Sequence, residues 1–299
     1  SGPLGSMVGL YESIIDRLAS WEVKGKMVRP KIVLSTATIR RASEQVRRIF
    51  CHQVQVFPPH GLDVEDNFFA VQEETGEEYP GRRYMGICAP GKKIKAVMIK
   101  TYVATLAASK KLYDKYGVMA DPWMTLVGYF NSIRELGGMR RLIDDAISNH
   151  LKKMSIYGLA NRYLESTSSV QELTSRQSST DIPQILDHLE IPFDPKKEAA
   201  RKELMEKKIK PTALDRRPLD ILLATNMLSV GVDVKRLGLM VMTRQPKTTA
   251  EYIQATSRVG RSFPGLVLTV YNWAHPRDLS HFERFEHYHA TFYKHVEAL

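Results

Sequence analysis

Short apolar runs that alternate with helix-like stretches dominate the sequence from residue 95 onward. The runs at 123–130, 219–224, 237–243 and 266–271 have the length of buried strands, and the stretches at about 95–116 and 133–153 have helical spacing. Thr248-Thr249-Ala250-Glu251 is typical of a capping box that opens a further helix. Strands that alternate with helices favour a mainly parallel sheet with helices on both faces. The sequence therefore predicts an α/β fold for residues 95–299.

The first 94 residues have a different pattern. Residues 1–6 resemble the remnant of a cleaved expression tag. A short apolar run at 31–34 precedes Ser35-Thr36-Ala37-Thr38, and apolar residues at helical spacing follow as far as Phe50, so residues 7–57 are predicted to hold a strand, a loop and a helix. Strand-like pieces at 54–57, 68–71 and 84–87 are broken by turn-forming segments. We expect residues 58–94 to form a linker with a small antiparallel β insertion.

Charge and cysteine content restrict the class of protein. The formal net charge is +10, which favours a polyanionic partner because each phosphate neutralised by Lys or Arg releases counterions. Cys51 and Cys88 have neither zinc-site nor disulfide-framework spacing, which fits a reducing cytoplasm. No apolar run approaches the ~20 residues of a membrane-spanning helix. The four histidines near the end lack the spacing of a helical metal pair, so no metal site is expected.

Polar residues follow the apolar run at 219–224. Ligands of open α/β sheets collect at the carboxyl ends of the strands, where Thr225, Gly231 and Asp233 would offer a hydroxyl, a bare backbone and a carboxylate. A strand followed by a glycine turn, with Asp233 as a cap, would give the same pattern. Turn chemistry alone leaves the two interpretations open.

The segment 254–261 carries two arginines. On a helix that begins near Thr249, Gln254, Arg258 and Arg261 would be spaced i, i+4 and i+7 and would share a face. Arginine side chains bind phosphate oxygens in a bidentate manner and can stabilise charge on a transferred phosphoryl group. The alternative is a surface stripe whose arginines pair with nearby carboxylates. Spacing does not decide between them.

Together these segments resemble the motifs of superfamily 2 helicases, in the right order. Ser35-Thr36-Ala37-Thr38 resembles motif III, residues 224–233 resemble motif V, and residues 254–261 resemble motif VI. Residues 130–132 are similar to motif IV, and 173–179 occupy the position of another nucleic-acid-contacting strand and loop. The resemblance implies a RecA-like C-terminal helicase domain at 95–299 and the tail of a first RecA-like lobe at 7–57. Residues 83–91 and 278–285 further resemble the DrmA family of the bacterial DISARM anti-phage system.

This resemblance also implies roles for individual residues. Those expected near ATP are Arg261 as the arginine finger, Arg258 as its companion toward the γ-phosphate, Gln254 as a nucleotide sensor, and Gly231 and Asp233 on the ribose side. Those expected on the phosphate backbone of a nucleic acid are Thr225, Asn131, Ser132 and Arg176. Those expected to couple the two sites are Ser35 and Thr38.

Half of the expected ATP site is missing from these residues. No Gly-x-x-x-x-Gly-Lys-Ser/Thr motif occurs, and no Asp-Glu pair precedes Ser35 to hold magnesium. We therefore expect ATP and Mg²⁺ to bind only together with a first RecA-like lobe of a parent chain, and expect the fragment alone to be inactive. The expected partners are DNA, with RNA still possible, and other DISARM proteins. The alternative is a helicase-shaped scaffold that binds nucleic acid or protein without hydrolysis.

Overall fold

The computed structural model describes residues 5–35, 42–57, 66–67, 70–71, 74–78, 81–165, 169–178, 180–206, 216–229 and 233–292. The chain divides into two compact units, which are described separately. Unit 1 comprises residues 1–72 and 296–299, and unit 2 comprises residues 73–295.

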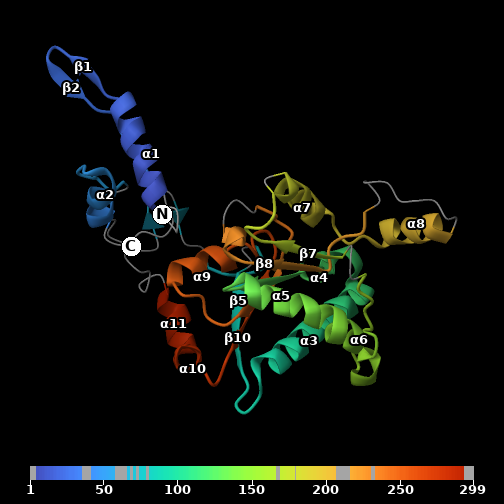
Figure 1. Ribbon diagram of the computed structural model, residues 1–299. Helices are drawn as coiled ribbons and strands as arrows, with labels where there is room; N and C mark the ends of the chain where they lie inside the picture. The colour runs from blue at the N-terminus through green and yellow to red at the C-terminus, as the bar shows by residue number, and fades with distance from the viewer. Residues whose placement is uncertain are drawn as a thin grey trace. The chain divides into compact units, whose positions relative to one another are not determined.

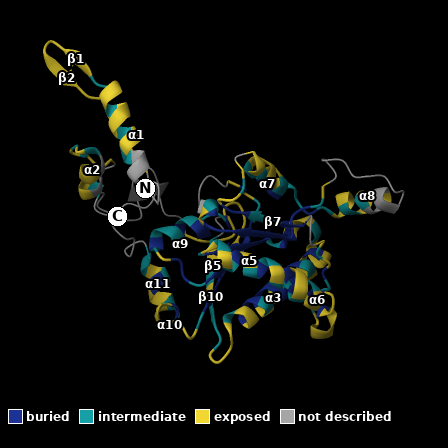
Figure 2. Cartoon of the chain, in the orientation of Figure 1, coloured by how far each residue is buried: buried dark blue, intermediate teal, exposed yellow. Residues whose placement is uncertain are grey.

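Unit 1 consists of short elements. Helix α1 (Gly5–Leu18) precedes an antiparallel hairpin of β1 (Trp21–Val23) and β2 (Lys26–Val28), whose two turn residues both have positive φ, as a tight hairpin turn requires. Helix α2 (Ala42–Phe50) confirms the predicted helix, and β3 (Asp66–Asn67) pairs antiparallel with β4 (Ala70–Val71). Figure 2 shows α1 and the hairpin mostly exposed. The strands predicted at 31–34 and 54–57 are wrong, because neither segment has a ladder partner in the described residues.

Unit 2 is built on a six-stranded sheet in which all neighbouring strands are parallel (Figure 1). The strands are, in spatial order, β5 (Arg82–Cys88), β10 (Gly265–Tyr271), β9 (Leu239–Thr243), β6 (Leu126–Phe130), β8 (Ile221–Ala224) and β7 (Val170–Leu173). Every residue of β6, β8 and β9 is buried, as expected for strands covered on both faces. The predicted parallel α/β fold is confirmed.

Helices pack on both faces of this sheet. One face is covered by α3 (Ile94–Tyr116), α5 (Ile133–Leu142), a π-helical turn at Ile143–Ile147 and α6 (Ser148–Leu151), with Tyr102, Leu106 and Leu136 in the core. The other face is covered by α7 (Asp181–Glu190), α9 (Thr249–Thr256) and α11 (Phe285–Thr291), with Leu189 and Tyr252 in the core. The remaining helices are α4 (Asp121–Met124), α8 (Pro195–Glu206) and α10 (Pro276–Glu283).

Two predicted strands differ from the structure, one in its bounds and the other in its position. The run at 123–130 starts its strand only at Leu126, because Pro122 lies in the first turn of α4, a position that proline favours. The strand-like piece at 84–87 belongs to β5, which pairs in parallel with β10 and is not part of an antiparallel insertion. β5 is an edge strand in which three residues are exposed and none is fully buried, so its sequence resembled a surface strand.

Candidate functional site

Polar residues follow three strands at the carboxyl edge of the sheet, where the parallel strands end together. Asn131 follows β6, and its side-chain amide donates to the Thr243 carbonyl (3.1 Å) at the end of β9. Ser132 is the N-cap of α5, and its hydroxyl accepts a hydrogen bond from the Glu135 amide (3.3 Å). The amide nitrogen of Asn131 is therefore already engaged within the protein, whereas Ser132 is exposed at a helix N-terminus.

Thr225 and Arg176 lie at the same edge with different exposure. Thr225 follows β8 and is only 5% exposed, with its hydroxyl directed to the Asn226 side-chain oxygen (3.4 Å). Arg176 follows β7 in an exposed turn. The structure thus brings the four predicted nucleic-acid residues to one edge.

The predicted arginine pair lies in a loop rather than on a helix face. Helix α9 begins at the predicted capping box, where the Thr248 hydroxyl accepts from the Glu251 amide (3.1 Å), but it ends at Thr256. Gly260 has φ +68°, and its amide donates to the Leu237 carbonyl (2.8 Å) just before β9. The expectation of a shared helical face is therefore wrong, because this left-handed glycine turns the chain. We call residues 257–261 the arginine loop.

A carboxylate lies against the arginine loop. Arg261 donates through Nη1 to Asp233 and through Nε to the Ser257 carbonyl (3.1 Å). Arg258 is half-buried. Burial is the larger cause and the nearby Arg261 the smaller cause of a lowered pKa of the Arg258 guanidinium, and the Asp233 carboxylate opposes this shift. Gln254 lies half-buried in the last turn of α9. Two guanidiniums and one carboxylate are thus concentrated here.

The arginine loop lies at the opposite edge of the sheet from Thr225. Gly260 is bonded just before β9, and the Gly265 amide, at the start of β10, donates to the Gly81 carbonyl (3.1 Å) just before β5. A parallel strand of five residues is ~16 Å long, and this length separates the amino ends of the strands from their carboxyl ends. The expectation that Asp233 and Thr225 meet at the carboxyl ends is therefore wrong, because the chain returns along the sheet before β9.

The remaining predicted residues are Ser35, Thr38 and Gly231. Ser35 is exposed in unit 1. Thr38 and Gly231 fall outside the described residues.

Two arginines that were not predicted donate hydrogen bonds to loop carbonyls, one at each end of the parallel strands. Arg82 on β5 donates through Nε to the Val259 carbonyl (2.6 Å), 177 residues away. Arg277 on α10 donates to the carbonyls of Gln245 (3.1 Å) and Lys247 (3.0 Å) after β9. No local sequence pattern identifies these contacts, because each depends on a backbone carbonyl from a distant segment.

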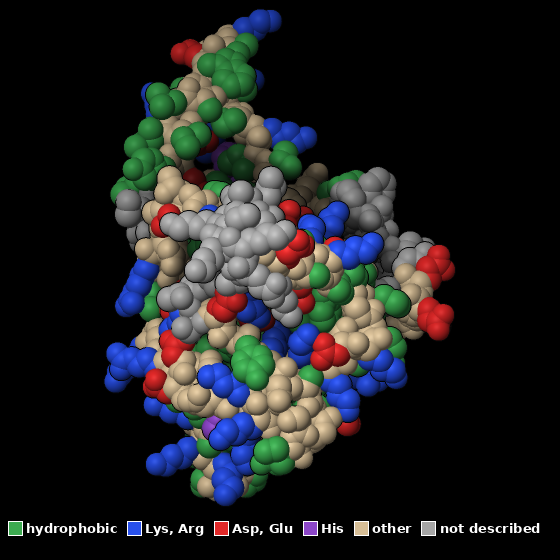
Figure 3. Space-filling view, turned by 90° about the vertical axis from the view of Figure 1, so that its right-hand side faces the viewer, with side chains coloured by type: hydrophobic (Ala, Val, Ile, Leu, Met, Phe, Trp, Pro, Cys, Tyr) green, Lys and Arg blue, Asp and Glu red, His purple; other side chains and the backbone are tan. Residues whose placement is uncertain are grey.

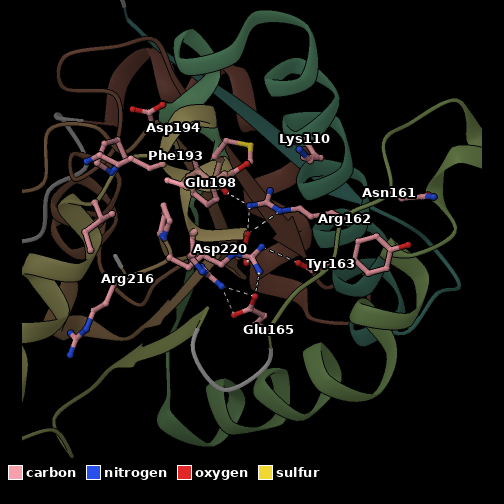
Figure 4. A pocket seen from close by; sticks show the side chains of 18 residues that line it. Lys110, Asn161, Arg162, Tyr163, Glu165, Phe193, Asp194, Glu198, Arg216 and Asp220 are labelled. Carbon is pink, nitrogen blue, oxygen red and sulfur yellow. Dashed lines mark hydrogen bonds and ion pairs between the residues drawn. The ribbon is translucent and has the colours of Figure 1, made fainter. Parts of the chain in front are cut away.

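Residues before β6 and β8 line a cavity with a volume of about 490 Å³. Figure 4 shows the side chains that line it. Some of its charged side chains pair with one another: Arg162 with Asp220 (2.6 Å), and Arg217 with Glu165 (3.1 Å). Arg162 and Asp220 are almost fully buried, so this pair belongs to the core beneath the cavity. We therefore interpret the cavity as a consequence of packing around this pair and not as a ligand site.

The face shown in Figure 3, the possible metal ligands and the helix lengths add no further candidate site among the described residues. On the face shown in Figure 3, Lys and Arg side chains are scattered rather than gathered in one stripe. Within the described ranges, no group of three or more His, Cys, Asp or Glu side chains could hold a metal ion. Across those same ranges, every helix is too short or too polar to cross a membrane.

Comparison with known proteins gives matches to helicases. Residues 163–263 match the family model of the helicase conserved C-terminal domain. The chain is 45% identical over 304 aligned residues to DISARM protein DrmA of Bacillus paralicheniformis, covering 100% of this chain and 25% of that protein. The chain thus spans about a quarter of the length of this curated relative.

Solved helicase structures are also similar to this chain, and the first of the two below supports the fold. The DUF1998 helicase MrfA bound to DNA and AMPPNP matches 88% of this chain and 28% of its own, with 18% identity and a TM-score of 0.50. The helicase Lhr of Mycobacterium smegmatis bound to single-stranded DNA and AMP-PNP matches 88% of this chain and 26% of its own, with 14% identity and a TM-score of 0.46. Residues 163–263 are therefore similar to the helicase conserved C-terminal domain, and the chain is similar along its whole length to a quarter of DISARM protein DrmA.

Proposed function

We propose that this chain is the C-terminal motor lobe of an ATP-dependent DNA helicase or translocase that acts in DISARM anti-phage defence. The observation that carries the proposal is the separation of two groups of polar residues. The arginine loop with Asp233 lies at one edge of the sheet, and Asn131, Ser132, Arg176 and Thr225 lie at the other. One lobe can therefore contact a nucleotide and a nucleic-acid strand at the same time.

The arginine loop suits a triphosphate. Arg258 and Arg261 are close enough for Arg261 to lower the pKa of Arg258, and an anion between them would relieve their repulsion. In this proposal Arg261 is the arginine finger, Arg258 contacts the γ-phosphate and Gln254 senses the nucleotide. Asp233 would accept a hydrogen bond from the ribose once Arg261 moves to the phosphate, with Gly231 beside it. Magnesium would be held by carboxylates of the first RecA-like lobe, which the described residues do not supply.

The carboxyl edge suits the phosphate backbone of DNA. Ser132 caps a ten-residue helix whose first amides point outward, an arrangement that binds phosphate, and Arg176 adds an exposed guanidinium. Thr225 would donate its hydroxyl, and Asn131 would exchange its bond to Thr243 for one to a phosphate. DNA is favoured over RNA because the MrfA structure, which shares the fold of this chain, contains DNA. Ser35 and Thr38 would couple the two sites from the first lobe.

ATP turnover tests the nucleotide half of the proposal. This chain alone should hydrolyse ATP no faster than a buffer control. A longer protein that supplies the phosphate loop should hydrolyse ATP, and Arg261→Ala should lower its kcat by about 10³- to 10⁵-fold, the range for an arginine finger. Unchanged turnover in Arg261→Ala would overturn the assigned role.

Fluorescence anisotropy of labelled single-stranded and duplex DNA across a salt series tests the other half. Thr225→Ala should weaken binding about five-fold, corresponding to one hydrogen bond of about 1 kcal/mol. The control is Thr105→Ala, because the Thr105 hydroxyl bonds only within α3, to the carbonyls of Thr101 and Tyr102. Equal affinities for both variants and the unaltered chain would remove Thr225 from the strand path.

A specific observation favours a second function. Arg261 already pairs with Asp233, as the surface-stripe alternative requires, and these 299 residues contain no phosphate-loop motif. A scaffold that binds DNA or protein without hydrolysis would explain both facts. Salt-dependent DNA binding, combined with no ATP turnover by the longer protein, would select this function over the motor.

A further inference from the structure

Arg82, the first residue of β5, holds the arginine loop from a distant part of the chain. Its Nε donates to the Val259 carbonyl (2.6 Å), and its Nη2 lies 3.5 Å from the Ser257 carbonyl. These carbonyls flank Arg258 on either side. Both follow the last residue of α9, where carbonyls lack intrahelical partners and a positive side chain is favourable.

The aliphatic part of Arg82 is packed against the same loop. Arg82 is in register with Gly265 of β10, and Gly265 touches Gly260 of the loop. A Cβ atom on Gly260 would lie 2.7 Å from the Gly265 Cα and 2.9 Å from the Arg82 Cγ. The loop backbone is therefore confined between a strand and an arginine stem, with no room for a side chain at Gly260.

The Arg82 contact also reaches Arg261. The Ser257 carbonyl that faces the Arg82 guanidinium also accepts a hydrogen bond from the Arg261 Nε (3.1 Å). One backbone oxygen thus joins the residue on β5 to the proposed arginine finger. A shift of Ser257 would change the direction of the Arg261 side chain as well as the backbone on either side of Arg258.

We propose that Arg82 is a positioning residue that fixes the two arginines of the arginine loop for phosphoryl transfer. The inference rests on the proposed motor function, since it assigns Arg82 a role through Arg258 and Arg261. In this role Arg82 acts through the loop backbone. A displacement of about 1 Å in a catalytic group can cost about 100-fold in rate, so holding this loop has a measurable consequence.

The test is ATP turnover by a longer protein that contains this chain and a phosphate loop. Arg82→Gln removes the charge and the fork of donors, and should lower kcat about 10- to 100-fold while changing the KM for ATP less than about two-fold. Arg82→Lys keeps one charged donor and should retain an intermediate kcat. Arg83→Gln is the matched control, because Arg83 is the exposed next residue of the same strand, and it should behave as the unaltered protein.

Hydrogen exchange of the present chain separates positioning from general stability. Amides of residues 257–261 should exchange faster in Arg82→Gln than in Arg83→Gln, while the thermal midpoint and exchange in β6 and β8 stay unchanged. Unchanged kcat and unchanged loop exchange, a rise in KM alone, or a uniform loss of protection would each overturn the inference. If Arg261→Ala retains full turnover, the arginine-finger role of Arg261 fails, and the exchange data alone then decide whether Arg82 holds the loop.

Discussion

Replacing Arg162 with methionine should strongly destabilise unit 2. Arg162 is 2% exposed and its guanidinium donates to Asp220, which is fully buried, at 2.6 and 3.1 Å. It also donates to the Leu106 carbonyl (3.2 Å), the Ser109 hydroxyl (3.0 Å) and the Met124 carbonyl (2.6 Å). The substitution leaves a buried carboxylate and three acceptors without these donors. Arg217 stays near Asp220 (3.2 Å) but is 21% exposed, so it compensates only in part.

Removing one partner of a buried ion pair costs about 3 to 5 kcal/mol. Small domains are stable by about 5 to 15 kcal/mol, so the loss is a large share of the total. Urea unfolding followed by circular dichroism should show a lower midpoint at an unchanged slope. The control is Lys110→Met at the rim of the same cavity (Figure 4), where the pair with Asp114 (2.7 Å) is solvent-exposed and is worth about 0.3 to 0.5 kcal/mol. Equal losses for both variants would refute the reasoning.

Two further substitutions test the loop and the C-terminal helices. Gly260→Ala should cost about 2 to 5 kcal/mol in urea unfolding, since alanine is strained at φ +68° and its Cβ would meet the Gly265 backbone. For His289, burial lowers the imidazole pKa below its usual 6.5, against the opposing bond to the Phe285 carbonyl. The unfolded state therefore binds the proton more readily than the folded state. The contribution of neutral His289 to the free energy of unfolding is complete above pH 6.5, and it decreases as the pH falls from 6.5 toward the lowered pKa. The thermal midpoint should fall more over that range in the unaltered chain than in His289→Gln, which also changes the bond to the Tyr252 hydroxyl (2.8 Å).

Each of these two predictions has a clear contrary result. A Gly260→Ala chain as stable as the original would mean that the loop can move away from β10. Parallel pH profiles for His289→Gln and the unaltered chain would mean that the other histidines account for the acid sensitivity.

Several elements of the candidate site could be predicted from local sequence. The helix N-cap at Thr248 forms as expected because its hydrogen bond from the Glu251 amide joins residues three apart. The apolar run at 219–224 forms β8 because strands buried on both faces need continuous apolar residues. The placement of Thr225 and Asn131 at strand ends follows from the same runs. Their proposed contacts with DNA remain predictions.

The errors arose where a distant contact overrides a local pattern. Helical spacing placed Arg258 and Arg261 on one face of α9, but the bond from Gly260 to Leu237 ends the helix earlier. The exposed residues of the edge strand β5 gave it the sequence of an antiparallel insertion, whereas its backbone pairs in parallel with β10. In each case the decisive partner is a backbone group, which carries no sequence signal.

The sequence by itself determined the class of fold of unit 2 and the apolar runs of its central strands, because hydrophobic periodicity and capping are local properties of the chain. The tertiary structure alone decided that Asp233 meets Arg261, that Thr225 lies at the opposite edge, and that Arg82 holds the arginine loop. These contacts form only when the sheet brings distant segments together, because their hydrogen bonds require a specific register between strands far apart in sequence.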